Sequence, residues 1–182
     1  DDSTPYSDDD FNYESTRRYA LILEQLMLKF STGLKNQMVG SIKGAVTATY
    51  SLEHGIGYIY SGSQPANADA AATGTLLMRI TVGSGAWTAG VATNGLDFDV
   101  AAGVITKSSS ETWSGVGLAD GTAGWIRFCG NAEDAGGVST TLPRIDCRVS
   151  TSGAECNLSN LNIVTGATTT IDSFSAAFPA SL

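Results

Sequence analysis

The stretch GIGYIYSGSQPANADAAATGTLLMRITV, residues 55–82, decides the fold class. At both of its ends every second residue is apolar, which predicts a strand with one buried face. These residues are Ile56, Tyr58 and Tyr60 in the first strand, and Leu76, Met78, Ile80 and Val82 in the second. Residues 61–74 between them are rich in Gly, Ser, Ala, Asn and Asp, a composition that favours a loop.

We expect this long loop to be ordered without a ligand. Pro65 fixes one φ angle and so lowers the entropy of the unfolded chain. Asn67 and Asp69 can accept hydrogen bonds from nearby backbone amides in Asx-turns.

The rest of the chain after residue 46 repeats this pattern of short strands and polar connections. Further strands are predicted at residues 96–100, 103–107, 122–129, 144–150, 158–164 and 169–178. Glycine-rich turns are predicted at residues 83–85, 115–121 and 130–137. No βαβ spacing occurs, so residues 47–182 are predicted to be mainly β, as an antiparallel β-sandwich or barrel-like domain.

The N-terminal part follows a different pattern. Residues 1–12 are strongly acidic and low in hydrophobicity, so they cannot order by themselves. We expect an extended arm that orders only against a neighbouring subunit, with a frayed terminus as the alternative. Residues 13–46 are predicted to be helical, in one or two helices. The first, residues 13–30, has helical i, i+3, i+4 spacing at Tyr19, Ile22, Leu23, Leu26 and Phe30. The second, shorter helix spans residues 34–46.

Charge argues against a nucleic-acid partner. The chain of 182 residues has 10 Lys and Arg against 18 Asp and Glu, a net charge of −8. Six of the acids lie in the first 14 residues, and the basic residues of the remainder form no cluster. No apolar run is long enough to span a membrane, so no membrane partner is expected.

The three cysteines, Cys129, Cys147 and Cys156, are expected to be free core thiols. Cys147 alternates with Ile145 and Val149, as a buried strand residue would. A disulfide between two of the three remains an alternative. No zinc-ligand spacing occurs, so we expect no metal and no other cofactor.

Three groups of residues could carry chemistry, and each has a simpler structural explanation. His54 is the only histidine, and no nucleophile motif accompanies it. Asp97 and Asp99 would share one strand face, as a calcium site, an acid/base pair of a hydrolase, or a solvated surface. Glu133 and Asp134 lie in a glycine-rich loop without the EF-hand pattern. We therefore predict no catalytic residues and a protein that is not an enzyme.

The tryptophans leave one alternative open. Trp87, Trp113 and Trp125 are expected to fill volume in a domain rich in small residues. Exposed tryptophans could instead stack on sugars, which would make the domain a carbohydrate- or receptor-binding module.

Several blocks of sequence resemble small virion proteins of tailed bacteriophages. The blocks are IYSGSQPANADAAATGTLL (residues 59–77), DGTAGWIRF (120–128), LPRID (142–146), TSGAECNL (151–158) and IVTGATTT (163–170). The resemblance implies a non-enzymatic virion protein assembled in the host cytoplasm, most simply a capsid decoration or cement protein. A neck, tail or fibre component is the alternative. It also implies the major capsid protein or other virion proteins as partners. Independently, residues 19–30 have apolar side chains on more than one side of the predicted helix, so we expect a homo-oligomer, with a trimer preferred.

Overall fold

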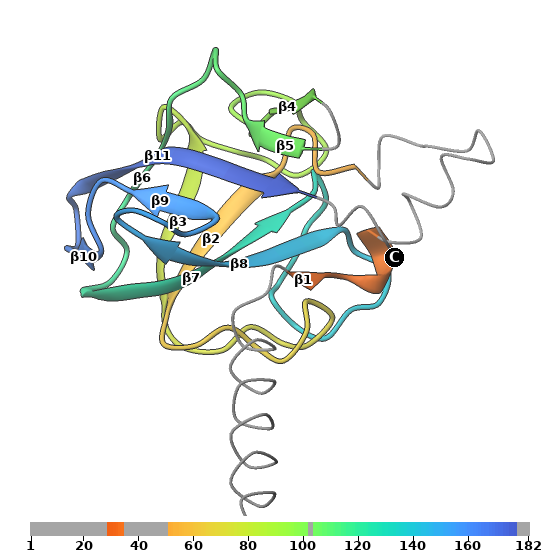
Figure 1. Cartoon of the computed structure of the whole chain (residues 1–182), viewed down its shortest axis with the longest axis horizontal. Helices are drawn as coiled ribbons and strands as arrows, with labels where there is room; N and C mark the ends of the chain where they lie inside the picture. Colours follow the sequence, from red (N-terminus) through yellow and green to blue (C-terminus); the bar gives the residue numbers. More distant parts are fainter. Residues whose placement is uncertain (1–28, 35–50, 102–103, 178–182) are drawn as a thin grey trace, which may run out of the picture.

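The computed structural model describes residues 29–34, 51–101 and 104–177, and this part is mainly β (Figure 1). Its strands are β1 (Lys29–Phe30), β2 (Ile56–Ser61), β3 (Leu76–Val82), β4 (Phe98–Ala101), β5 (Val104–Lys107), β6 (Trp113–Val116), β7 (Gly121–Cys129), β8 (Arg144–Ser150), β9 (Cys156–Leu158), β10 (Asn162–Ile163) and β11 (Thr168–Ala177). The predicted fold class is confirmed. Among the described residues, no helix is both long enough and apolar enough to cross a membrane.

Seven of the described strands close into a barrel. β8, β7, β2, β3, β6, β11 and β9 pair in that order, and β9 pairs back with β8 (Figure 1). Strand direction must alternate in an antiparallel ring, so a ring of seven strands needs one parallel pair. That pair is β8–β9, whereas the other six are antiparallel.

The remaining described strands extend the barrel. β1 pairs with the start of β8, with Lys29 opposite Asp146. The β4–β5 hairpin attaches to the end of β11. β10 pairs with the start of β7.

An aromatic cluster fills the barrel interior. Phe98, Trp113, Phe128 and Phe174 contact one another with ring centroids 4.7 to 6.3 Å apart. Aliphatic side chains surround them, among them Ile59, Met78, Ile80, Ile126 and Ile145. Burial of large aromatic rings is the main source of stability in such a core.

The outer face of β2 and β7 is buried as well, which corrects the prediction that the strand at residues 56–60, now β2, has one buried face. Ile56, Tyr58 and Tyr60 form a second buried apolar cluster with Trp125 and Cys129, outside the barrel. The rings of Tyr60 and Trp125 stack at 4.7 Å. Ile59, between the two tyrosines, points inward and is fully buried. Both faces are covered because the connections after β2 and β7 fold back over the barrel.

Three predicted elements differ from those observed. A helix was expected at residues 13–30, but its last two residues, Lys29–Phe30, form β1. The described residues do not include residues 1–28 or 35–50, so they do not test the acidic arm, the rest of this helix or the second helix beyond Leu34. β6 falls partly in a stretch predicted to be a glycine-rich turn. It forms because Gly115 allows close approach: a Cβ there would lie 2.1 Å from the Arg79 carbonyl oxygen. The strand predicted at residues 158–164 is divided into β9 and β10 by a turn in which Asn160 bonds Asn162.

The loop between β2 and β3 is held by hydrogen bonds at many points. The Asn67 side chain accepts from the backbone amides of Asp69 and Ala70, as predicted. Asp69 does not cap its own loop. Its carboxylate accepts from the backbone amide and the hydroxyl of Thr32, at 2.7 and 2.6 Å. The loop is therefore fastened to the segment that follows β1.

Candidate functional site

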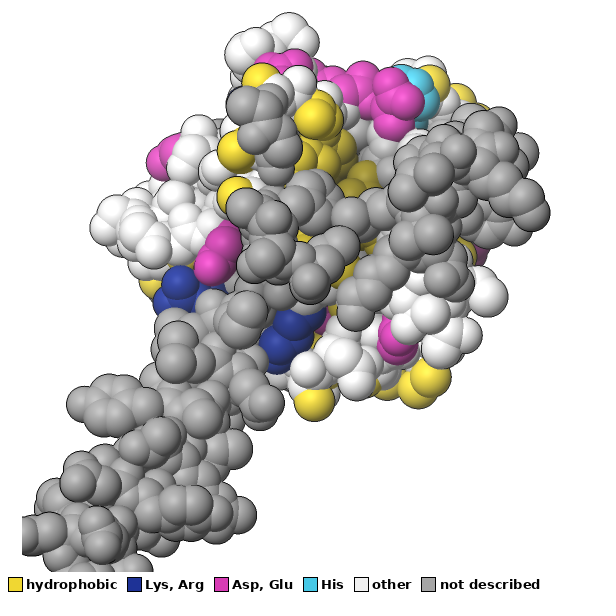
Figure 2. Space-filling model, turned by 45° about the vertical axis from the view of Figure 1, so that its right-hand side comes forward, with side chains coloured by type: hydrophobic (Ala, Val, Ile, Leu, Met, Phe, Trp, Pro, Cys, Tyr) yellow, Lys and Arg dark blue, Asp and Glu magenta, His cyan; other side chains and the backbone are white. Residues whose placement is uncertain are grey.

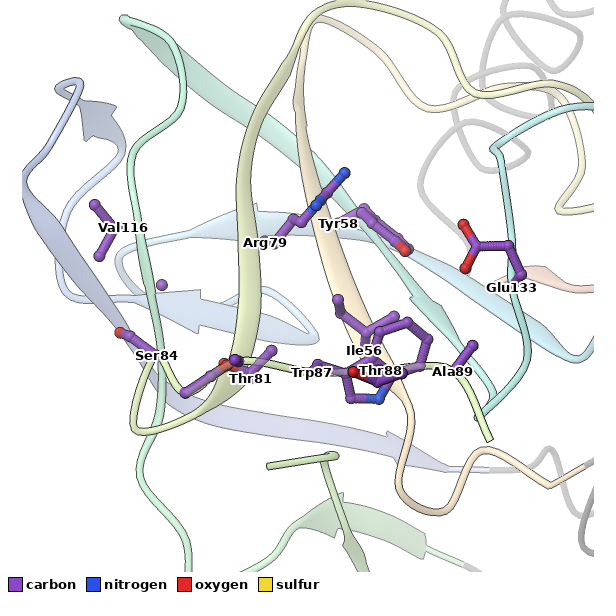
Figure 3. Close-up of a pocket in the computed structure, with 13 residues that line it drawn as sticks. Ile56, Tyr58, Arg79, Thr81, Ser84, Trp87, Thr88, Ala89, Val116 and Glu133 are labelled. Atoms are coloured by element: carbon purple, nitrogen blue, oxygen red, sulfur yellow. The ribbon is translucent and has the colours of Figure 1, made fainter. Parts of the chain in front are cut away.

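A cleft of about 520 Å³ lies on the outside of the barrel, over β2 and β3. Its floor comes from Ile56, Tyr58, Arg79 and Thr81. Residues 84–89, after β3, form one wall, and Glu133, after β7, contributes a side chain at one end (Figure 3). This volume is in the range of small-molecule sites, about 300–1,000 Å³.

Trp87 is held in a fixed orientation in this cleft. Its Nε1–H donates to the His54 carbonyl oxygen at 2.9 Å. The ring is half-buried and packs against the outer cluster that contains Tyr58 and Trp125. One side of the indole is thus covered while the side chain also lines the cleft.

Tyr58 lies between two charged residues of the cleft. In Figure 3 its ring stands between Arg79, on β3, and Glu133. Burial raises the pKa of the Tyr58 hydroxyl above its usual value, and Arg79 offsets only part of that effect. The hydroxyl therefore stays protonated at neutral pH.

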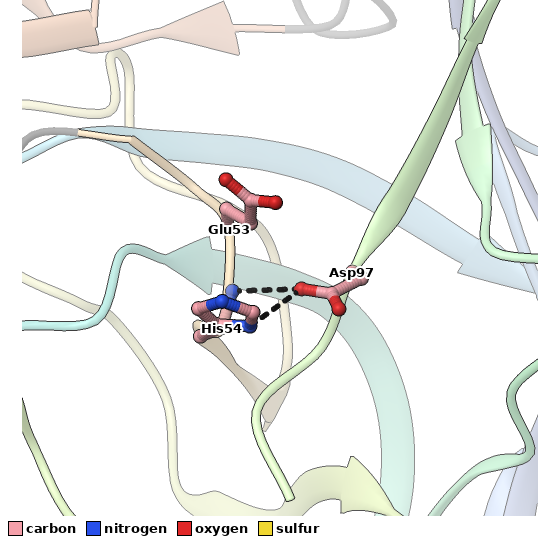
Figure 4. Close-up of side chains that lie close together, drawn as sticks. All are labelled: Glu53, His54 and Asp97. Carbon is pink, nitrogen blue, oxygen red and sulfur yellow. Dashed lines mark hydrogen bonds and ion pairs between the residues drawn. The ribbon is translucent and has the colours of Figure 1, made fainter. Parts of the chain in front are cut away.

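The structure brings His54 and Asp97 together, which the sequence analysis did not predict. His54 Nδ1 lies 2.8 Å from an Asp97 carboxylate oxygen, and the same oxygen accepts from the His54 backbone amide at 3.1 Å (Figure 4). His54 has a φ of 58°, a conformation that the double contact with Asp97 helps to hold. Figure 2 shows the histidine beside acidic side chains at the surface.

Glu53 completes a group that could hold a metal ion. One ligand atom each from Glu53, His54 and Asp97 lies within 4.8 Å of the others. One nitrogen and two oxygens suit zinc, which would need water as a fourth ligand. Glu53 is exposed and the other two are more than a third exposed, so the group is open to solvent.

Asp97 and Asp99 do not form a pair of free carboxylates. Asp99 accepts a hydrogen bond from the Ser109 backbone amide at 2.8 Å, while Asp97 is engaged by His54. Glu111 binds the backbone amide of Asp97 and the indole of Trp113 with one oxygen. Glu111 thus joins the residue before β4 to Trp113 of the aromatic cluster.

Asp134 is a structural residue rather than a calcium ligand. Both of its oxygens accept from Arg144 at 2.6 Å, and one also accepts from the Cys129 thiol. Burial alone would raise the pKa of Asp134. The hydrogen bonds from Arg144, the Gly136 amide and Cys129 have a larger effect in the opposite direction, so the pKa of Asp134 lies below its usual value. Glu133, its neighbour in the chain, lines the cleft instead.

A second buried ion pair lies beside the first. Arg127 on β7 and Asp146 on β8 form two hydrogen bonds of 2.7 Å, and neither side chain is exposed. Arg127 Nη1 has no hydrogen-bond partner in the described residues, but the guanidinium carbon lies 5.4 Å from the Trp125 ring centroid. This cation–π contact compensates part of the lost hydration.

The remaining predictions concern tryptophans and cysteines. Trp113 and Trp125 are fully buried and fill volume, as expected, so only Trp87 of the three lines an accessible cleft. All three cysteines are free and buried, as expected.

The cleft could not be read from the sequence as one site. Arg79 is the charged residue on the polar side of the alternating run in β3, so its exposure was predictable. Glu133 and Trp87 belong to connections far apart in the chain, and no spacing rule relates them. Comparison with protein-family models, curated proteins and solved structures found no match to this chain.

Proposed function

We propose that this chain is a non-enzymatic structural protein of a tailed-phage particle, in which it decorates the capsid surface. The observation that carries the proposal is where the phage-like blocks fall in the fold. Residues 59–77 include the β2–β3 loop, and residues 120–128 and 142–146 supply Trp125, Arg127, Arg144 and Asp146.

These blocks meet in one layer outside the barrel. Arg144 donates to the Ala68 carbonyl oxygen at 3.3 Å, and Trp125 donates to the Thr73 carbonyl oxygen at 3.3 Å. The Ala72 amide donates to the Gly136 carbonyl oxygen at 2.8 Å. The blocks thus build a fixed loop surface, a feature suited to contact with another protein.

The charge distribution suits a protein partner better than nucleic acid. Of the six Lys and Arg among the described residues, Arg127 and Arg144 are buried in ion pairs. The other four, Lys29, Arg79, Lys107 and Arg148, lie on four different strands, β1, β3, β5 and β8. A phosphate backbone would need clustered cations.

The proposed partners are further copies of the chain, as a trimer, and the major capsid protein. The test is the location and copy number of the chain in intact particles, by cryo-electron microscopy and quantitative mass spectrometry. We expect density on the capsid exterior and a copy number that follows the capsomers. Density confined to the neck, tail or fibres would replace the capsid role by one of those roles, and absence from purified particles would refute the proposal.

A further inference from the structure

The cleft over β2 and β3 holds two charged side chains that the fold itself does not use. Arg79 is exposed, and Glu133 is exposed at the other side of Tyr58 (Figure 3). Within the described residues neither side chain takes part in a hydrogen bond or ion pair, and the charges of both act on the nearby Tyr58 hydroxyl. In contrast, Arg127 and Arg144 each bind a carboxylate through two nitrogens.

The apolar part of the cleft is prepared in advance. The Trp87 ring is fixed by its bond to the His54 carbonyl oxygen and by the apolar cluster behind it. A ligand that packs on this ring therefore does not bear the entropic cost of ordering it. Mostly small residues line the rest, among them Ser84, Gly85, Ala86, Thr88, Ala89 and Gly115.

We propose that this cleft binds a saccharide of one or two rings. A pyranose has an apolar face of C–H groups that can lie on an indole, and a rim of hydroxyls that donate and accept. The Glu133 carboxylate can accept from two neighbouring hydroxyls, and the Arg79 guanidinium can donate to two sugar oxygens. The Tyr58 hydroxyl can do either.

A saccharide suits this cleft better than a peptide. A bound strand would need a row of free backbone groups, but β3 is paired on both sides, with β2 and β6. The cleft of about 520 Å³ combines the fixed ring of Trp87 with the carboxylate of Glu133, the guanidinium of Arg79 and several hydroxyls. This combination suits a compact ligand with many hydroxyls. The inference does not depend on the particle role, because the cleft would be present in either setting.

The experiment is an NMR titration of the ¹⁵N-labelled full chain with cellobiose, maltose and N,N′-diacetylchitobiose, each to about 10 mM, well above a weak Kd of about 1 mM. We expect at least one disaccharide to shift the Trp87 indole N–H signal. The indole signals of Trp113 and Trp125 serve as internal controls, since both rings are fully buried. A Trp87→Phe variant assigns the signals.

Arg79→Ala is the decisive variant, because Arg79 is exposed and its removal leaves the core intact. We expect a roughly tenfold weaker Kd, as for the loss of one charge-assisted hydrogen bond. Glu133→Gln should weaken binding similarly. Arg148→Ala is the matched control, since Arg148 lies on β8 outside the cleft and its Nε is 3.6 Å from a Glu155 oxygen; its Kd should not change.

Three outcomes would overturn the proposal. The first is that no disaccharide shifts the Trp87 signal. The second is binding that Arg79→Ala and Glu133→Gln leave unaltered. The third concerns the tetrapeptide Gly-Asp-Lys-Gly, titrated in parallel as a control: if it shifts the same signals at lower concentration than any disaccharide, the cleft is a peptide site.

Discussion

At the scale of single residues, the two buried ion pairs are the features with the largest expected effects. Each joins an arginine and an aspartate through two short hydrogen bonds, with side chains no more than 2% exposed. Such a pair adds little over a well-packed apolar pair, but removal of one partner leaves a buried charge without compensation.

We therefore expect Asp134→Asn to lower the free energy of unfolding by roughly 3 kcal/mol or more. The variant keeps the shape of the side chain but leaves the Arg144 charge without its counter-ion. Urea denaturation followed by circular dichroism measures the difference. Asp172→Asn, an exposed change on β11, is the control and should have little effect. Equal stability of the two variants would contradict this account of the ion pair.

Acid should weaken the protein partly through the same residue. The folded-state pKa of Asp134 is lower than its unfolded value, so its stabilisation is present above about pH 4 and is lost as pH falls through the folded pKa. Below pH 4 the unfolding free energy of the wild type should thus fall more steeply than that of Asp134→Asn. Denaturation series at constant ionic strength would show this, and parallel curves would exclude the assignment.

At the scale of elements, sequence alternation located most strands but not their environment. The alternating apolar residues of β2 were correctly expected to be buried, yet their face lies outside the barrel. Alternation reports that a face is covered, and cannot tell a barrel interior from a loop-covered exterior. β6 was missed because Gly115 and its neighbours are typical of turns, and its role as a strand depends on a long-range approach to β3.

The candidate site shows the same limit. His54 and Asp97 are 43 positions apart, so nothing in the sequence relates one to the other. Their contact depends on the approach of residues 55 and 96, which pair as an isolated bridge. Trp87 could be listed as a candidate from composition, but its difference from Trp113 and Trp125 required the tertiary structure.

In the β2–β3 loop, two glycines allow the cost of a positive φ to be measured apart from the cost of a steric overlap. Both Gly62 and Gly74 have positive φ, at 75° and 81°. A Cβ on Gly74 would lie 2.0 Å from the Ser61 carbonyl oxygen, whereas a Cβ on Gly62 would meet nothing within 4 Å. Gly62→Ala should lower the free energy of unfolding by about 1–2 kcal/mol, from backbone strain alone. Gly74→Ala should lower it clearly more, because the overlap with Ser61 adds to the strain. Thermal unfolding compares the two, and equal losses would mean that the loop end can shift to avoid the overlap.

At the scale of the whole molecule, the arm prediction becomes an assembly experiment. Residues 1–12 contain five aspartates and few apolar residues. We expect their deletion to leave the melting temperature of the barrel nearly unchanged and to weaken self-association and capsid binding. Light scattering and particle-binding assays measure the second effect. A fall of many degrees in melting temperature would show that residues 1–12 belong to the fold.

The order in which the ring closes has a consequence for synthesis of the chain on the ribosome. β2 and β3 leave the exit tunnel early, but β7, β8, β9 and β11 come from residues 121–177. The partner of β6 along the ring is β11, the final strand of the described chain, and β9 must sit between β11 and β8. Until β11 has emerged, the nascent sheet has open edges able to pair with other nascent chains. The barrel can therefore close only after β11 has left the ribosome, and a chaperone that covers the open edges until then would protect the nascent chain from such pairing.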